Sequence, residues 1–379
     1  MHIYRKFTGS TARRDDMQIL QQNNLLILYL CLFFCLCIGL FNCYEIIHRQ
    51  YRRRSQKKQK EKWKRFFGQQ LELYRENEKL REELGRQFRS RLHTSGTLLI
   101  LEQAWDEMQK EAKSGDGFRS MLELWMHMVL HAYRDSEEII QAYLIMLLGK
   151  YRIRTTQSIR FIFDMQKTEN IDIQSEAFHS ICRMNDGNYA RLSLLRINRL
   201  DIEVNQKMIT DALMECQDKR GFFAAILPEM KKLKSYIQVG IISALDERAD
   251  ESVVRILKQR MRDAKEDKEV RIAVLKLFAR YRDEETLDIL LDYAASGEWE
   301  YAAIAAKSLA HYPCRRTAEQ LKARVSDKNW HVRYNNAMSL VTMAQQEDIE
   351  EILCGKDLYA RDILQYALNG RKEGAYGMA

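Results

Sequence analysis

Residues 270–275 read VRIAVL, and the same pattern of apolar and small residues returns at a spacing of 31 residues. It recurs as VGIISA at 239–244, YAAIAA at 301–306 and VRYNNA at 332–337. A fixed period of this size is typical of stacked helical hairpins, in which each repeat buries its apolar face against its neighbours. The sequence therefore predicts an all-α fold, with an α-solenoid of helical hairpins over residues 205–370.

The rest of the chain also favours helices, because residues that break helices are scarce. The 379 residues include only 2 prolines and 16 glycines, which favours long helices joined by short turns. Residues 93–204 are predicted to form a less regular helical-repeat region, with amphipathic helices at 97–113, 118–133, 136–150 and 155–166.

Residues 327–340 contain the pattern D-x(4)-V-R-x(3)-A-x(2)-L. This stretch resembles the second helix of a HEAT repeat, and the period is similar to that of the short HEAT repeats of the bilin-lyase type. The resemblance implies that Asp327, Arg333 and the equivalent Arg271 stabilise neighbouring repeats. The chain departs from the pattern at two positions where arginine is expected, Gly240 and Ala302.

Residues 25–44, LLILYLCLFFCLCIGLFNCY, contain no charged side chain. A helix of this length spans about 30 Å, the thickness of the hydrocarbon core of a bilayer. We therefore predict a transmembrane helix. Two alternatives stay open. A buried helix of a soluble protein would rarely be apolar on every face over this length, and a cleaved signal peptide would be followed by a small-x-small site, which is absent here.

Basic residues concentrate on the C-terminal side of this segment. Residues 45–65 hold ten Lys and Arg, against four in residues 1–24. Because basic flanks stay in the cytoplasm, we expect residues 1–24 to lie outside the cell membrane and the C-terminal body to be cytoplasmic. The basic residues are also expected to contact the anionic lipid surface, in particular Arg49, Arg52, Arg53, Arg54, Lys57 and Lys58.

Residues 45–92 are predicted to form this basic segment and then a charged stalk helix. Leu80, Leu84, Phe88 and Leu92 recur at a spacing of four and form one apolar stripe. The stripe either packs on the body or pairs with a second chain. A coiled coil is the weaker alternative, because no heptad pattern is sustained. Residues 371–379 are expected to form a flexible tail.

One group of residues in the sequence could form a metal site. Glu123, His127, His131 and Asp135 follow one another at a spacing of four, so they share one helical face and have side chains that bind zinc. A single helix face cannot surround a metal ion, and the residues also suit the polar edge of an amphipathic helix. No phosphate-binding or nucleophile motif occurs in the sequence. We therefore predict no catalytic residues, metal or cofactor.

Two further observations concern partners. Residues 66–379 hold 47 Lys and Arg against 49 Asp and Glu, and such a neutral body does not indicate nucleic-acid binding. Trp299 and Trp330 lie one repeat apart. They belong either to the packing between repeats or to a shared exposed face, where they would anchor a protein partner.

These observations favour a noncatalytic scaffold or adaptor that binds a partner protein at the cytoplasmic membrane face. An integral-membrane enzyme complex is a plausible partner, and no small-molecule substrate is evident. Two alternatives stay open. One is an enzyme with a site in the groove of the solenoid, as the similarity to bilin-lyase-type repeats implies. The other is a helical-repeat protein that binds nucleic acid.

Overall fold

A computed structural model describes residues 8–74, 85–88, 92, 95–111, 116–200, 204–245, 251–343 and 345–376. Every regular element in these ranges is a helix, and none of the described residues lies in a strand. The predicted all-α class is therefore confirmed. The chain divides into two compact units, residues 1–125 and 126–379, and each unit is described here by itself.

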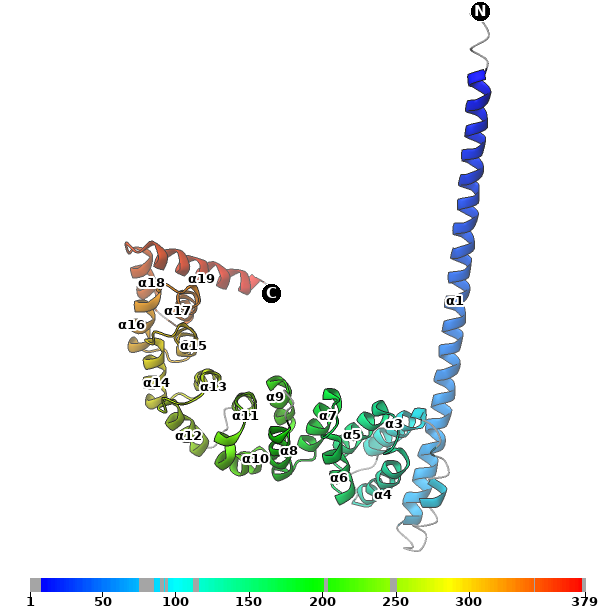
Figure 1. Ribbon diagram of the computed structural model, residues 1–379, viewed down its shortest axis with the longest axis horizontal. Helices are drawn as coiled ribbons and strands as arrows, with labels where there is room; N and C mark the ends of the chain where they lie inside the picture. The colour runs from blue at the N-terminus through cyan, green and yellow to red at the C-terminus, as the bar shows by residue number, and fades with distance from the viewer. Residues whose placement is uncertain are drawn as a thin grey trace, which may run out of the picture. The chain divides into compact units, whose positions relative to one another are not determined.

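The first unit contains one very long helix, α1 (Thr8–Tyr74) (Figure 1). It continues without a break from the apolar residues through the basic segment into the predicted stalk. Among the described residues, one helix is long and apolar enough to cross a membrane, and it is this one, over Leu32–Gln69. Its apolar side chains are exposed from residue 32 to residue 44, so they take no part in the core of this chain.

The end of α1 packs against α3 (Ser95–Glu111) and the first part of α4 (Asp116–Tyr133). The ring of Phe67 lies 4.2 Å from that of Trp125 and 5.7 Å from that of Trp105, measured between centroids. Phe88 lies 5.8 Å from Phe67, and all four rings are fully buried. The aromatic part of the stalk stripe therefore packs on helices of the same chain, while Leu80 and Leu84 lie outside the described residues.

In the second unit the helices alternate between two rows (Figure 1). In the odd-numbered row each helix packs on the next: α5 (Glu138–Lys150), α7 (Ile171–Arg183), α9 (Gln206–Glu215), α11 (Ser235–Ser243), α13 (Lys268–Phe278), α15 (Trp299–Leu309), α17 (Trp330–Met343) and α19 (Leu358–Tyr376). The even-numbered row consists of α6 (Thr156–Met165), α8 (Gly187–Arg199), α10 (Lys219–Ile226) with the 3-10 helix η1 (Leu227–Lys232), α12 (Glu251–Met261), α14 (Glu284–Ala294), α16 (Arg315–Arg324) and α18 (Gln346–Leu353).

The sequence period corresponds to this alternation. The motifs at 239–244, 270–275, 301–306 and 332–337 fall on α11, α13, α15 and α17, which are successive members of the odd-numbered row. The two-row arrangement also extends through α5 to α9, which include the described part of residues 138–204, where the sequence predicted a less regular helical-repeat region. The last helix, α19, continues to Tyr376, into the residues expected to form a tail.

Buried serines connect neighbouring helices of the odd-numbered row. The Ser308 hydroxyl donates a hydrogen bond of 2.8 Å to the Leu275 carbonyl, and the Ser339 hydroxyl donates one of 2.8 Å to the Ala306 carbonyl. These serines lie one period apart. The small serine side chain allows the two helix backbones to approach closely. Its buried hydroxyl is satisfied by a carbonyl of the neighbouring helix instead of by water.

The two departures from the HEAT pattern also lie at close packing contacts. A Cβ added to Gly240 would lie 2.8 Å from the Cβ of Ile209 on α9, so the position has no room for a side chain. Ala302 is fully buried beside Ala303 and Val332. An arginine at either position would lie inside the packing between helices, which accounts for the small residues there.

Candidate protein-binding surface

Trp299 and Trp330 are the first residues of α15 and α17. Their side chains are 42% and 47% exposed, whereas Trp105 and Trp125 are fully buried. The sequence left open whether Trp299 and Trp330 belong to the core or to a surface. The structure places both at the surface, at equivalent points of successive repeats.

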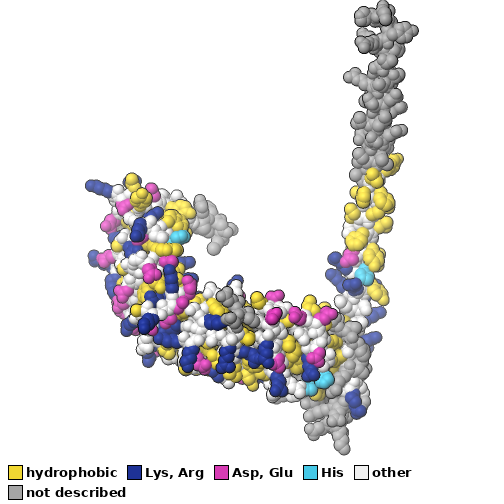
Figure 2. All heavy atoms as spheres, viewed as in Figure 1, with side chains coloured by type: hydrophobic (Ala, Val, Ile, Leu, Met, Phe, Trp, Pro, Cys, Tyr) yellow, Lys and Arg dark blue, Asp and Glu magenta, His cyan; other side chains and the backbone are white. Residues whose placement is uncertain are grey.

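Five rings form a continuous series across three odd-numbered helices, and we call them the aromatic surface: Trp299, Trp330, His331, Tyr334 and Tyr366. His331 lies between the two indoles, with centroids 5.1 Å from Trp299 and 5.2 Å from Trp330. Trp330 stacks on Tyr334 at 5.0 Å, and Tyr334 lies 6.1 Å from Tyr366 of α19. In Figure 2 hydrophobic side chains, with a histidine among them, gather over this end of the second unit.

The turn before α17 fixes the start of that helix, where two of these rings lie. The Asp327 carboxylate accepts a hydrogen bond of 2.8 Å from the Asn329 amide and lies 2.7 Å from Arg324. Arg333 donates to the carbonyls of Asp327 and Lys328, at 2.7 and 3.1 Å. Its guanidinium lies 5.6 Å from the ring of Tyr359 in α19. Asp327 and Arg333 thus hold a turn next to the aromatic surface, and Arg333 also contacts the following odd-numbered helix.

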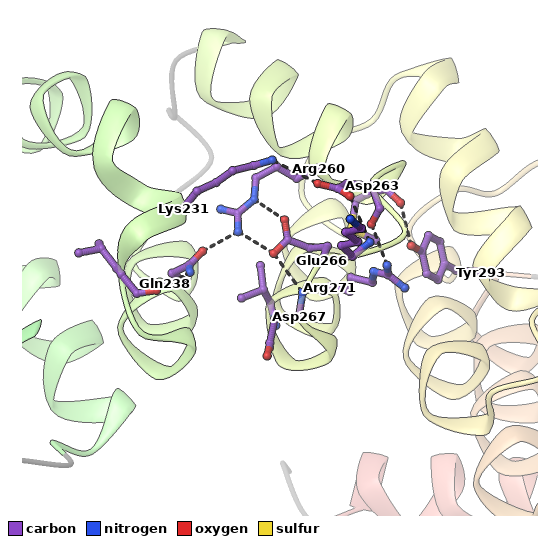
Figure 3. A network of polar contacts seen from close by, with 12 residues as sticks. Lys231, Gln238, Arg260, Asp263, Glu266, Asp267, Arg271 and Tyr293 are labelled. Atoms are coloured by element: carbon purple, nitrogen blue, oxygen red, sulfur yellow. Dashed lines mark hydrogen bonds and ion pairs between the residues drawn. The ribbon is translucent and has the colours of Figure 1, made fainter. Parts of the chain in front are cut away.

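Arg271 of α13, two odd-numbered helices before α17, makes the same two kinds of contact. Figure 3 shows its contact with the turn before α13. Arg271 donates a hydrogen bond of 2.8 Å to the Asp263 carbonyl in this turn. Its guanidinium lies 5.9 Å from the ring of Tyr301 in the next odd-numbered helix, α15. An arginine that binds its own turn and the face of a tyrosine in the next repeat is therefore a recurring device of this chain.

A buried ion pair in the same region had no signal in the sequence. Arg260 of α12 donates to Glu266 in the following turn and to Gln238 of α11 (Figure 3). Burial alone would raise the pKa of Glu266. The hydrogen bonds and charge of Arg260 outweigh this effect and hold that pKa below its usual value. The contacts join two repeats, which gives the pair a structural role.

The histidine face of α4 borders an open hollow of about 410 Å³ against α6. His127, His131 and Asp135 line it together with Arg160 and Asp164. Both carboxylates already face cations, since Asp135 lies 3.2 Å from Arg134 and Asp164 lies 2.9 Å from Lys167. Glu123 lies 3.8 Å from Arg119 on its own helix. Over the described part of the chain, no three His, Cys, Asp or Glu side chains are grouped so as to hold a metal ion.

The six basic residues predicted to contact lipid are all solvent-exposed on α1. They are Arg49, Arg52, Arg53, Arg54, Lys57 and Lys58. Arg49 lies 2.8 Å from Glu45, one turn earlier on the same helix. The structure thus presents these cations directly after the apolar residues, on the helix that bears both.

The chain matches no protein-family model and no curated protein. Among solved structures, human deoxyhypusine hydroxylase in complex with glycerol is similar over 76% of this chain and 96% of that chain, with 14% sequence identity and a TM-score of 0.28. The likeness is too weak to carry an argument about activity.

Proposed function

We propose that this chain is a membrane-anchored helical-repeat scaffold that binds a partner protein at the cytoplasmic face of the membrane. The observation that carries the proposal is the aromatic surface. Tryptophan and tyrosine are the side chains that most often dominate the binding energy of protein interfaces. Here two exposed tryptophans and two tyrosines occupy one continuous surface of the second unit.

The surroundings of the aromatic surface favour a partner segment that presents apolar side chains. Leu358 and Tyr359 are exposed at the start of α19 and add apolar area. Arg361 and Asp362 are exposed on the same helix and carry opposite charges. Their charges offset each other beside the aromatic surface, so they do not favour a strongly charged partner. An amphipathic helix that lays its apolar face over the rings would meet these requirements.

The apolar section of α1 supports the anchoring part of the proposal. Its side chains are exposed along the helix and have no place in the core of this chain, as expected for residues in contact with lipid. The basic residues that follow favour a cytoplasmic body. An anchor raises the effective concentration of the aromatic surface for any partner in the same membrane. We therefore favour an integral-membrane protein complex, such as a membrane-bound enzyme, as the partner.

The partner-binding role is tested with the full-length chain purified from its own membranes in mild detergent. The test variant carries Trp299→Ala and Trp330→Ala. The control carries Ile139→Ala and Met214→Ala, which remove exposed apolar side chains elsewhere on the second unit. We expect one protein to co-purify in stoichiometric amount with the wild type and the control, and at least about tenfold less with the test variant. Equal recovery from all three chains would contradict the proposal.

The anchor is tested separately by washing membranes with alkaline carbonate. An integral chain stays in the pellet and is released only by detergent. A chain that carbonate releases would contradict anchoring by α1. The orientation is read from a reporter fused after Ala379, which should behave as a cytoplasmic protein.

A further inference from the structure

The two rows of the second unit differ in charge over residues 150–234. The even-row segments 150–167, 186–199 and 218–234 hold thirteen Lys and Arg and four Asp and Glu. The odd-row segments 169–183 and 205–216 hold two Lys and Arg and five Asp and Glu. Asp201 and Glu203 lie outside the described residues. The neutral total for the body therefore hides a basic row beside an acidic one.

Six cationic side chains of the even-row segments are exposed and make no hydrogen bond or ion pair with any described residue. We call them the basic face: Arg152, Arg154, Arg160, Arg199, Arg220 and Lys232. They recur from the turn before α6 to the end of η1. In Figure 2 Lys and Arg side chains are spread along the side of the second unit that carries α6, α8, α10 and α12.

The four acidic residues of these segments are engaged elsewhere. The Asp186 carboxylate accepts hydrogen bonds of 3.1 Å from two amides at the start of α8. Asp218 accepts from the amides of Gly221 and Gly187, at 3.1 and 3.0 Å. Asp164 pairs with Lys167, and Glu229 pairs with Arg191 at 2.6 Å. None of the four makes an ion pair with a residue of the basic face in the described part of the chain.

Further along, the even-numbered row neutralises its own cations. Arg316 of α16 pairs with Glu284 and Asp288 of α14. Lys322 of α16 pairs with Asp348 and Glu351 of α18, at 2.9 and 2.7 Å. The acidic helices α14 and α18 thus alternate with the basic helix α16. The helices α6, α8 and α10 have no such acidic neighbour in their row, so the cations of the basic face are not neutralised by an adjacent helix of that row.

We propose that the basic face lies against an anionic membrane surface. This proposal rests on the anchoring part of the proposed function, since a tethered body meets the lipid surface at high effective concentration. Each cation close to an anionic leaflet strengthens binding by about a kcal/mol, or roughly fivefold. Six cations spread over successive helices match a lipid surface, where negative charge is available at every point.

Nucleic acid is the other large anion that such a face meets, and the structure favours it less. Binding of single strands uses exposed aromatic rings on which bases stack. On the even-row segments Tyr151, Phe222 and Phe223 are buried, and Phe161, Phe163 and Tyr189 are partly buried. The guanidinium of Arg196 lies 5.8 Å from the ring of Phe163. Among the described residues of these segments every aromatic side chain is buried or partly buried, whereas the six cations of the basic face are exposed.

The test uses the full-length chain in phosphatidylcholine nanodiscs, so that α1 is already inserted in uncharged lipid. The nanodiscs are mixed with sedimentable vesicles of phosphatidylcholine alone or with about 30% phosphatidylserine, an anionic surface of physiological strength. The test variant changes the six residues of the basic face to Gln. The matched control removes the same number of exposed charges outside the basic face and outside the segment after the apolar residues, by changing to Gln Lys276, Arg282, Lys307, Lys328, Lys356 and Arg361. Circular dichroism checks that both variants keep their helices.

We expect the wild type and the control to bind the anionic vesicles and to lose binding at high salt. The basic-face variant should bind at least about tenfold less. Equal binding of all three chains, or binding that does not need phosphatidylserine, would overturn the proposal. Tighter binding of duplex DNA or RNA than of anionic vesicles at physiological salt would overturn it as well. Failure of the anchor is recognised separately, as release of the wild-type chain from membranes by carbonate.

Discussion

The guanidinium of Arg260 donates two hydrogen bonds, of 2.6 and 2.8 Å, to the carboxylate of Glu266. Both side chains are buried, with 3% and 8% of their surface exposed. Arg260 also binds Gln238, so the pair joins α11, α12 and the turn before α13. Removing one partner of such a pair leaves the other charge buried without compensation, which costs far more than breaking a pair in water.

The change Glu266→Gln is therefore expected to lower the free energy of unfolding by about 3 kcal/mol. Arg316→Gln breaks the exposed contacts with Glu284 and Asp288 and is the matched control, with an expected loss of at most about 1 kcal/mol. Urea unfolding of the full chain in detergent, followed by helical circular dichroism, measures both. If both variants shifted the urea midpoint by the same amount, the buried pair would contribute no more to stability than the exposed contacts of Arg316.

The same pair predicts a dependence of stability on pH. The pKa of Glu266 is lowered in the folded chain, because the bonds and charge of Arg260 outweigh the opposing effect of burial. The unfolded chain then takes up the proton first. The stabilisation is complete above the ordinary pKa of 4.5 and is lost as the pH falls through the folded pKa. The stability difference between wild type and Glu266→Gln should therefore shrink below that pH. A constant difference over the acidic range would contradict this assignment.

Close approach of α11 to α9 predicts the effect of Gly240→Ala. The added methyl group would lie 2.8 Å from the Cβ and 2.9 Å from the Cγ2 of Ile209. We expect a loss of about 1–3 kcal/mol from overpacking. Gly297→Ala is the control, since no described atom lies within 4 Å of its added Cβ. Neither position has a positive φ, so the backbone of both accepts alanine. Gly240 lies inside α11, where alanine is the better helix former, so a net loss of stability there is a lower bound on the cost of overpacking. Thermal unfolding measures both variants. If Gly297→Ala lowered the unfolding temperature and Gly240→Ala left it unchanged, the close contact between α11 and α9 would be contradicted.

The period of 31 residues predicted the odd-numbered row because every repeat uses the same face of that helix for packing. It also placed Trp299 and Trp330 at equivalent points. Their exposure depends on the turns before α15 and α17. In the turn before α17, Asp327 and Arg333 hold the backbone in place, and the repeat period does not predict such contacts. The basic face was hidden for a related reason. Charges on adjacent rows cancel in a count along the chain and separate only when each helix is assigned to a row.

Two thiols of the odd-numbered row are expected to resist alkylation. Burial raises the pKa of Cys182, with a smaller contribution from Cys216, and burial raises the pKa of Cys216 to about 11. Because the thiolate is the reactive form, the reactive fraction of Cys216 falls on the order of a hundredfold. Cys314 and Cys354 are exposed. Iodoacetamide at mildly alkaline pH should label these two in the native chain, and Cys182 and Cys216 only after unfolding in urea. Peptide mass spectrometry measures each site, and native labelling of Cys182 as fast as that of Cys354 would contradict the packing of α7 against α9.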